Sequence, residues 1–102
     1  MSALINKKML SEIPDLYTQE SSTDPLCHIK LFTPDSNWTW YIIECSHNDH
    51  STCFGYVMSL EDELGYFSLQ EIESIRGKLG LAVEIDTSFT PTQLSVVRKE
   101  VS

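Results

Sequence analysis

Two cysteines and two histidines lie close together in one short stretch, at a spacing that could bind a metal ion. They are Cys45, His47, His50 and Cys53, four of the chain's six cysteine and histidine residues, within nine positions. Structural zinc sites favour four ligands drawn from thiolates and imidazoles, and two intervening residues are a common ligand spacing. The pattern therefore predicts a structural zinc ion at these four residues.

Two alternatives stay open for this loop. Four ligands from one short loop are sterically demanding, so Cys27 or His28 from a neighbouring strand could replace one of them. The other alternative is a polar hairpin tip, in which the cysteines pack as strand residues and the histidines are solvated. An odd number of cysteines argues against a disulfide framework and favours free thiols or metal ligands.

The loop is predicted to join two strands. Residues 38–45 and 53–60 are rich in aromatic and β-branched side chains, and the polar link between them favours an antiparallel hairpin. Trp38, Trp40 and Ile42 alternate with Thr39, Tyr41 and Ile43. Because apolar side chains point to both sides of this strand, we expect helices to cover both of its faces.

The remaining pattern predicts a small α+β domain. Further strands are expected at 26–31 and 81–85, with an acidic turn and a short strand at 61–67. Helices are expected near 6–17, where Pro14 interrupts, from the capping box of Ser68 and Glu71 to a C-cap at Gly77, and from about Thr90 onward. We expect one domain over residues 1–102, with an antiparallel sheet of three to five strands and two or three helices.

Negative charge is the most unusual bulk property. The chain has 15 acidic and 7 basic residues, a net charge of -8. Residues 31–75 contain no Lys or Arg and hold eight acids: Asp35, Glu44, Asp49, Glu61, Asp62, Glu63, Glu71 and Glu73. Such a surface repels nucleic acid and attracts basic protein grooves, although acidity can also serve solubility alone.

Three local motifs resemble a small single-domain family of unknown function carried by plasmids and phages. They are Trp38-Thr39-Trp40-Tyr41, Gly65-Tyr66-Phe67-Ser68-Leu69, and the stretch Arg76-Gly77 with Leu79-Gly80-Leu81, and the resemblance covers about residues 26–95. It implies a mobile-element gene product and interference with host defence, and it brings no assigned catalytic residues. The loop at 45–53 departs from the shorter Asp/Gly-type loop of such proteins, so a metal site there would be peculiar to this member.

Charge and resemblance together predict a non-catalytic inhibitor of a nucleic-acid-targeting host defence complex, of the anti-CRISPR or anti-restriction type. It would bind a basic protein through Glu61, Asp62, Glu63 and Glu73, without direct contact with nucleic acid or membrane. We predict no catalytic or cofactor-binding residues apart from the zinc ligands, and a location in the host cytoplasm. The alternatives are a zinc-stabilised structural or adaptor domain and, least favoured, a small metal-dependent hydrolase.

Overall fold

The computed structural model describes residues 4–19 and 21–101. The first three residues, residue 20 and the last residue of the expected domain lie outside this range. The elements in chain order are α1 (Lys7–Glu12), β1 (Leu26–Cys27), β2 (Ile29–Phe32), β3 (Thr39–Cys45), β4 (Thr52–Met58), β5 (Asp62–Ser68), α2 (Leu69–Ser74), β6 (Glu84–Ile85), β7 (Thr92–Gln93) and α3 (Leu94–Val101).

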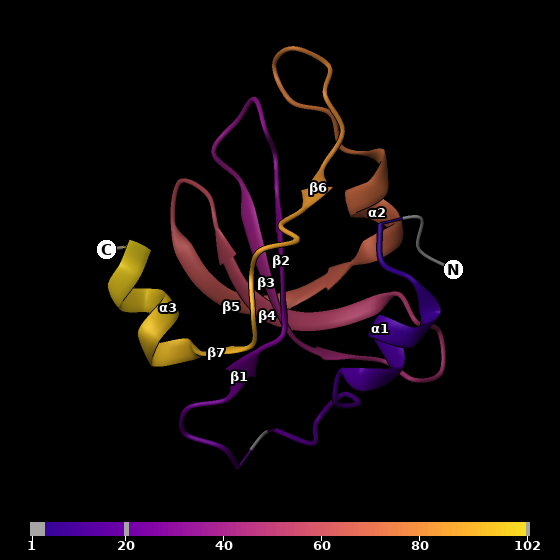
Figure 1. The fold of residues 1–102 in the computed structure, drawn as a ribbon, viewed down its shortest axis with the longest axis vertical. Coiled ribbons are helices and arrows are strands. Elements are labelled where there is room, and N and C mark those ends of the chain that lie inside the picture. Colours follow the sequence, from indigo (N-terminus) through magenta and orange to yellow (C-terminus); the bar gives the residue numbers. More distant parts are fainter. Residues whose placement is uncertain (1–3, 20, 102) are drawn as a thin grey trace.

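A five-stranded sheet, ordered β5-β4-β3-β2-β6, forms the centre of the fold (Figure 1). All of its strand pairs are antiparallel, and β1 pairs with β7 in a separate two-stranded sheet. The α+β prediction is therefore confirmed. None of the helices within the described ranges is long and apolar enough to cross a membrane.

Both faces of β3 are covered, as its alternation predicts. Trp40 and Ile42 pack in a first core with side chains of α1 and α2, including Leu10 and Ile72. On the opposite face a second core contains Tyr41, Ile43, Cys27 and Tyr56 and is closed by Leu94 and Val97 of α3. Figure 1 shows α3 on one side of the sheet and α1 and α2 on the other.

The start of α2 agrees with the predicted capping box, but its end does not. The Ser68 hydroxyl oxygen accepts a hydrogen bond from the backbone N–H of Glu71, so one unpaired N–H of the first turn is satisfied. The helix then ends at Ser74 with Ile75 as its C-cap, so the C-cap predicted at Gly77 is wrong. A Cβ at Gly77 would collide with the carboxylate of Asp35, so close packing against that side chain accounts for the glycine.

The strand after the acidic turn is longer than expected. β5 has seven residues and pairs with β4 along its whole length, from Asp62 opposite Met58 to Ser68 opposite Thr52. It ends the sheet on one side, where the described part of the chain places no further strand. Charged side chains are common on exposed edge strands. Here the acids at the start of β5 interrupt the alternation of apolar residues, so the sequence indicated a shorter strand.

The strand predicted at 26–31 is divided. β1 turns away at His28 to pair with β7, an element the sequence did not predict, while β2 pairs with β3 and β6. Its alternation is nevertheless correct, since Cys27, Ile29 and Leu31 are all buried. Short pairings of two residues lack a pattern of their own, so only the tertiary arrangement separates the two sheets.

Candidate functional site

Cys45 and Cys53 face each other across the β3–β4 hairpin. They are direct partners in the strand register, and neither side chain is exposed to solvent. A hydrogen bond between the two thiols lowers the pKa of Cys45 and raises that of Cys53. The structure thus brings two of the four predicted zinc ligands together.

The histidines of the same loop have different surroundings. Nε2 of His47 lies 2.8 Å from the carbonyl oxygen of Ile13, and the His47 backbone N–H donates to Asp15. His50 has a left-handed backbone with φ of 52°, and its Nδ1 is buried, with no hydrogen-bond partner among the described residues. The loop therefore points His47 toward the segment after α1 and leaves one ring nitrogen of His50 unpaired.

No group of three or more His, Cys, Asp or Glu side chains that could hold a metal ion occurs within residues 4–19 and 21–101. Because Nε2 of His47 is taken up by the Ile13 carbonyl, Nδ1 is the ring nitrogen of His47 left for a zinc ion. Cys27, the suggested substitute, packs in the second core, whereas Cys45 and Cys53 belong to the first core on the other face of the sheet. Zinc binding at this loop stays a prediction.

Several acids of the base-free window bind backbone N–H groups inside the molecule. The carboxylate of Glu44 is 3% exposed and accepts hydrogen bonds from the N–H groups of Tyr17 at 3.0 Å and Gln19 at 2.7 Å. Asp35 accepts from the N–H of Leu79 at 2.6 Å. These two carboxylates hold loops that are distant in sequence, so they contribute little to an exposed acidic surface.

Asp49 and Glu73 also have structural contacts. Oδ1 of Asp49 accepts from the N–H groups of Ser51 and Thr52 and so orders the tip of the β3–β4 hairpin. Oε1 of Glu73, on α2, accepts from the N–H of Leu4 at 3.2 Å. Glu73 follows the far end of β5, so the structure does not bring it together with the other three predicted partner-binding residues.

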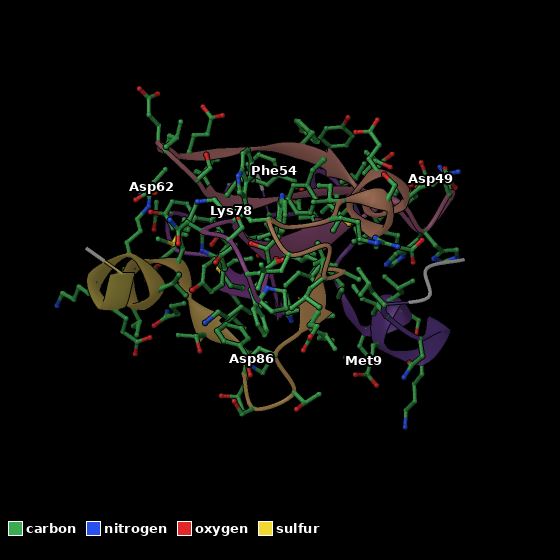
Figure 2. All side chains as sticks on the ribbon, turned by 90° about the horizontal axis from the view of Figure 1, so that it is seen from above. Met9, Asp49, Phe54, Asp62, Lys78 and Asp86 are labelled. Carbon is green, nitrogen blue, oxygen red and sulfur yellow. The ribbon has the colours of Figure 1, made fainter. Side chains whose placement is uncertain are left out.

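Glu61, Asp62 and Glu63 form the acidic hairpin, the exposed connection between β4 and β5 together with the start of β5. The preceding Leu60 is fully exposed, at 101%. Asp62 hydrogen-bonds Tyr56, and the pKa of that tyrosine is raised, first by burial and then by this bond. Figure 2 shows Asp62 and Asp49 near opposite ends of the molecule, so the acidic hairpin is separate from the cysteine loop.

A cavity of about 520 Å³ lies beside β5, on the sheet face that carries the second core. Its lining includes Ile43, Phe54, Leu64, Tyr66, Leu94 and Arg98. The rings of Phe54 and Tyr66 are tilted against each other with centroids 5.1 Å apart, and the guanidinium of Arg98 lies 5.2 Å from the ring centre of Tyr56. The lining also includes polar side chains, among them Gln19, Thr23 and the buried Glu44, so the cavity has both apolar and polar walls.

Sequence reasoning did not identify this cavity. The alternation of Leu64 and Tyr66 was the only available signal, because these positions fall on one face of a strand. Arg98 comes from the last helix and Gln19 from the first loop, and no local pattern connects them with β5.

Comparison with protein families gives a match over nearly the whole chain. A family model described as "Protein of unknown function (DUF2958)" matches residues 3–100. The chain belongs to the DUF2958 family. The expectation of a small family of unknown function is thus confirmed, and the match spans the whole α+β domain of this DUF2958 protein. No curated protein and no solved structure matches the chain.

Proposed function

We propose that this protein inhibits a nucleic-acid-targeting host defence complex by binding it, without catalysis. The observation that supports the proposal is the acidic hairpin, where Glu61, Asp62 and Glu63 are exposed beside the fully exposed Leu60. Charged residues around an apolar contact suit a protein surface that carries Lys and Arg. The bound surface would be the basic nucleic-acid channel of an effector of the CRISPR or restriction type.

The hydrogen bonds of the other acids limit the proposed binding surface to one hairpin. Because Asp35, Glu44 and Glu73 bind backbone groups of the same chain, and Asp49 lies alone at the other hairpin tip, the acidic hairpin supplies the concentrated exposed charge. The binding mode is therefore a local contact by one hairpin, and extended mimicry of a phosphate backbone is not required. The place of action would be the cytoplasm of a host cell that carries a plasmid or phage.

The test is inhibition of DNA cleavage by purified CRISPR effectors and restriction enzymes, together with plaque formation in cells that carry them. We expect the wild-type protein to inhibit at least one system, less strongly at high salt. The combined variant Glu61→Lys, Asp62→Lys and Glu63→Lys should lose this inhibition. The matched control Glu12→Lys, Glu84→Lys and Glu100→Lys changes the net charge equally at exposed positions elsewhere and should retain it.

Two outcomes would count against the proposal. Failure to inhibit any system at saturating protein would remove its functional basis. Equal loss in the two triple variants would show that total charge matters and the position of the hairpin does not.

A zinc ion in the cysteine loop is a separate part of the proposal. The facing thiols of Cys45 and Cys53 and the unpaired Nδ1 of His50 support it. Such an ion would keep the β3–β4 hairpin rigid and would serve equally in the alternative function, a zinc-stabilised adaptor domain without inhibitory activity. Zinc dependence therefore does not distinguish these two functions, whereas the charge variants do.

A further inference from the structure

We propose that the outer edge of β5 and the cavity beside it form one groove that binds an extended, basic segment of a partner protein. The inference rests on the proposed function and names the surface and the form of the ligand. This β5 groove consists of residues 61–66 together with Phe54 and Arg98.

The first argument is the position of β5 in the sheet. It is an edge strand of seven residues, and an edge strand offers backbone N–H and C=O groups to an added strand. A Cβ built at Gly65, near its middle, meets no atom within 4 Å, so the sheet face opposite to Leu64 and Tyr66 is open at this position.

The second argument is the exposed apolar surface next to that edge. Leu64 is 41% exposed and Tyr66 56% exposed, and the two side chains share the strand face that borders the cavity. In an added strand, alternate side chains would lie on this same face. One apolar side chain of the partner could then enter the cavity of about 520 Å³ between Phe54 and Leu94.

The third argument is charge, which selects the partner. The groove holds three acids in the acidic hairpin against the one cation of Arg98, so Lys or Arg side chains of a paired segment would lie against Glu61 and Glu63 at its acidic end. A second copy of this chain is a poor match, because its net charge is also -8 and its β5 carries the same acids. The occupant is therefore a β-paired segment of a basic protein.

The test is a nuclear magnetic resonance titration of the full chain with the capped peptide Lys-Lys-Thr-Leu-Thr-Val-Thr-Lys-Lys. This probe has a β-forming centre and basic ends that suit either strand direction. We expect saturable amide shifts in β5 and in the cavity lining. A peptide with Glu in place of Lys, and one with alternate backbone nitrogens methylated, should each bind about tenfold more weakly or not at all.

Leu64→Lys should weaken peptide binding about tenfold, because it removes an apolar contact and adds a like charge. Leu79→Lys is the matched control, since Leu79 is 80% exposed in a loop outside the groove, and it should leave binding unchanged. A thermal melt of each variant confirms that it is folded. Should Leu64→Lys not fold, the shift pattern of the wild-type protein with the three peptides still decides the result.

Shifts outside the β5 groove, absence of binding at millimolar peptide, or equal binding of the methylated peptide would overturn the inference. A dimer in solution that Leu64→Lys dissociates would overturn it too, because the occupant would then be a second copy. The two proposals can fail separately. Full inhibition by Leu64→Lys would refute the groove and leave the proposed inhibition standing. Peptide binding in the groove without inhibition of any defence complex would support the groove and refute the proposed inhibition.

Discussion

The backbone N–H of Gln19 donates a 2.7 Å hydrogen bond to the buried carboxylate of Glu44, 25 residues farther along the chain. With the second bond, from Tyr17, this carboxylate fixes the loop after α1 against the sheet and so forms one wall of the cavity. The arrangement makes Glu44 important for stability although it lies outside every predicted site.

We expect Glu44→Ala to lower the free energy of unfolding by about 3 kcal/mol, because two N–H groups lose a charged acceptor. Glu44→Gln should cost roughly half as much, since an amide oxygen can still accept a bond. Urea denaturation measures both values. The exposed Glu12→Ala serves as control and should change stability by less than about 0.5 kcal/mol; an equal loss in Glu44→Ala and this control would contradict the structural role.

Two glycines paired across β4 and β5 should respond differently to the same substitution. A Cβ at Gly55 would collide with the backbone carbonyl oxygen of Tyr41, which a rigid central strand cannot move away. Gly55→Ala should therefore destabilise the protein by about 3 kcal/mol. Gly65→Ala meets no atom within 4 Å and should stay within about 0.5 kcal/mol of wild type. Similar thermal melts for the two variants would contradict the packing described.

Stability should depend on pH through Asp49. Hydrogen bonds, first from the side chain of Thr52 and then from the backbones of Thr52 and Ser51, lower its pKa from 3.8 to about 2. A carboxyl with a lowered folded-state pKa stabilises the protein above its unfolded value, and this contribution is lost as the pH falls through the folded value. We expect unfolding experiments to show a loss of stability between pH 3.8 and about 2.

The variant Thr52→Val should reduce this pH dependence, because it removes the hydroxyl that donates to Asp49 at 2.7 Å. Thr87→Val, at an exposed position in another loop, is its control. A pH profile of Thr52→Val that matches the wild type would show that Asp49 is not the group responsible.

The three thiols should react slowly in the folded protein. Cys27, Cys45 and Cys53 are free and fully buried, and burial is the main cause that raises the pKa of Cys27 to about 12. Because the reagent must reach the sulfur and all three side chains are buried, a disulfide reagent such as Ellman's should modify them rapidly only after denaturation. Rapid reaction of one thiol in the native protein would show that the hairpin opens.

Metal content tests the zinc prediction directly. Elemental analysis of protein purified without a histidine tag should give about one zinc per chain, and chelation should lower the melting temperature. Cys45→Ser and Cys53→Ser should abolish metal binding, whereas Cys27→Ser, in the other core, should not. A metal-free protein whose melting temperature does not change with chelation would contradict the zinc prediction and favour the alternative, a polar hairpin tip without metal.

Local patterns in the sequence determined several features correctly. The alternation around Trp40 and Tyr41 predicted a strand buried on both faces, and Ser68 with Glu71 predicted the start of α2. The antiparallel hairpin of residues 38–45 and 53–60 was also predicted correctly. Each of these depends on neighbouring residues, whose side-chain directions the strand or helix period specifies.

Other features were decided only by the tertiary structure. The composition counted Asp35, Glu44 and Glu73 as part of an acidic surface, but their carboxylates bind N–H groups of residues 25 to 69 positions away. The position of β5 at the edge of the sheet and the cavity that Arg98 borders were likewise decided by the tertiary structure. Hydrogen-bond partners and strand order depend on how distant segments meet, and a charge count or a local period carries no information about that meeting.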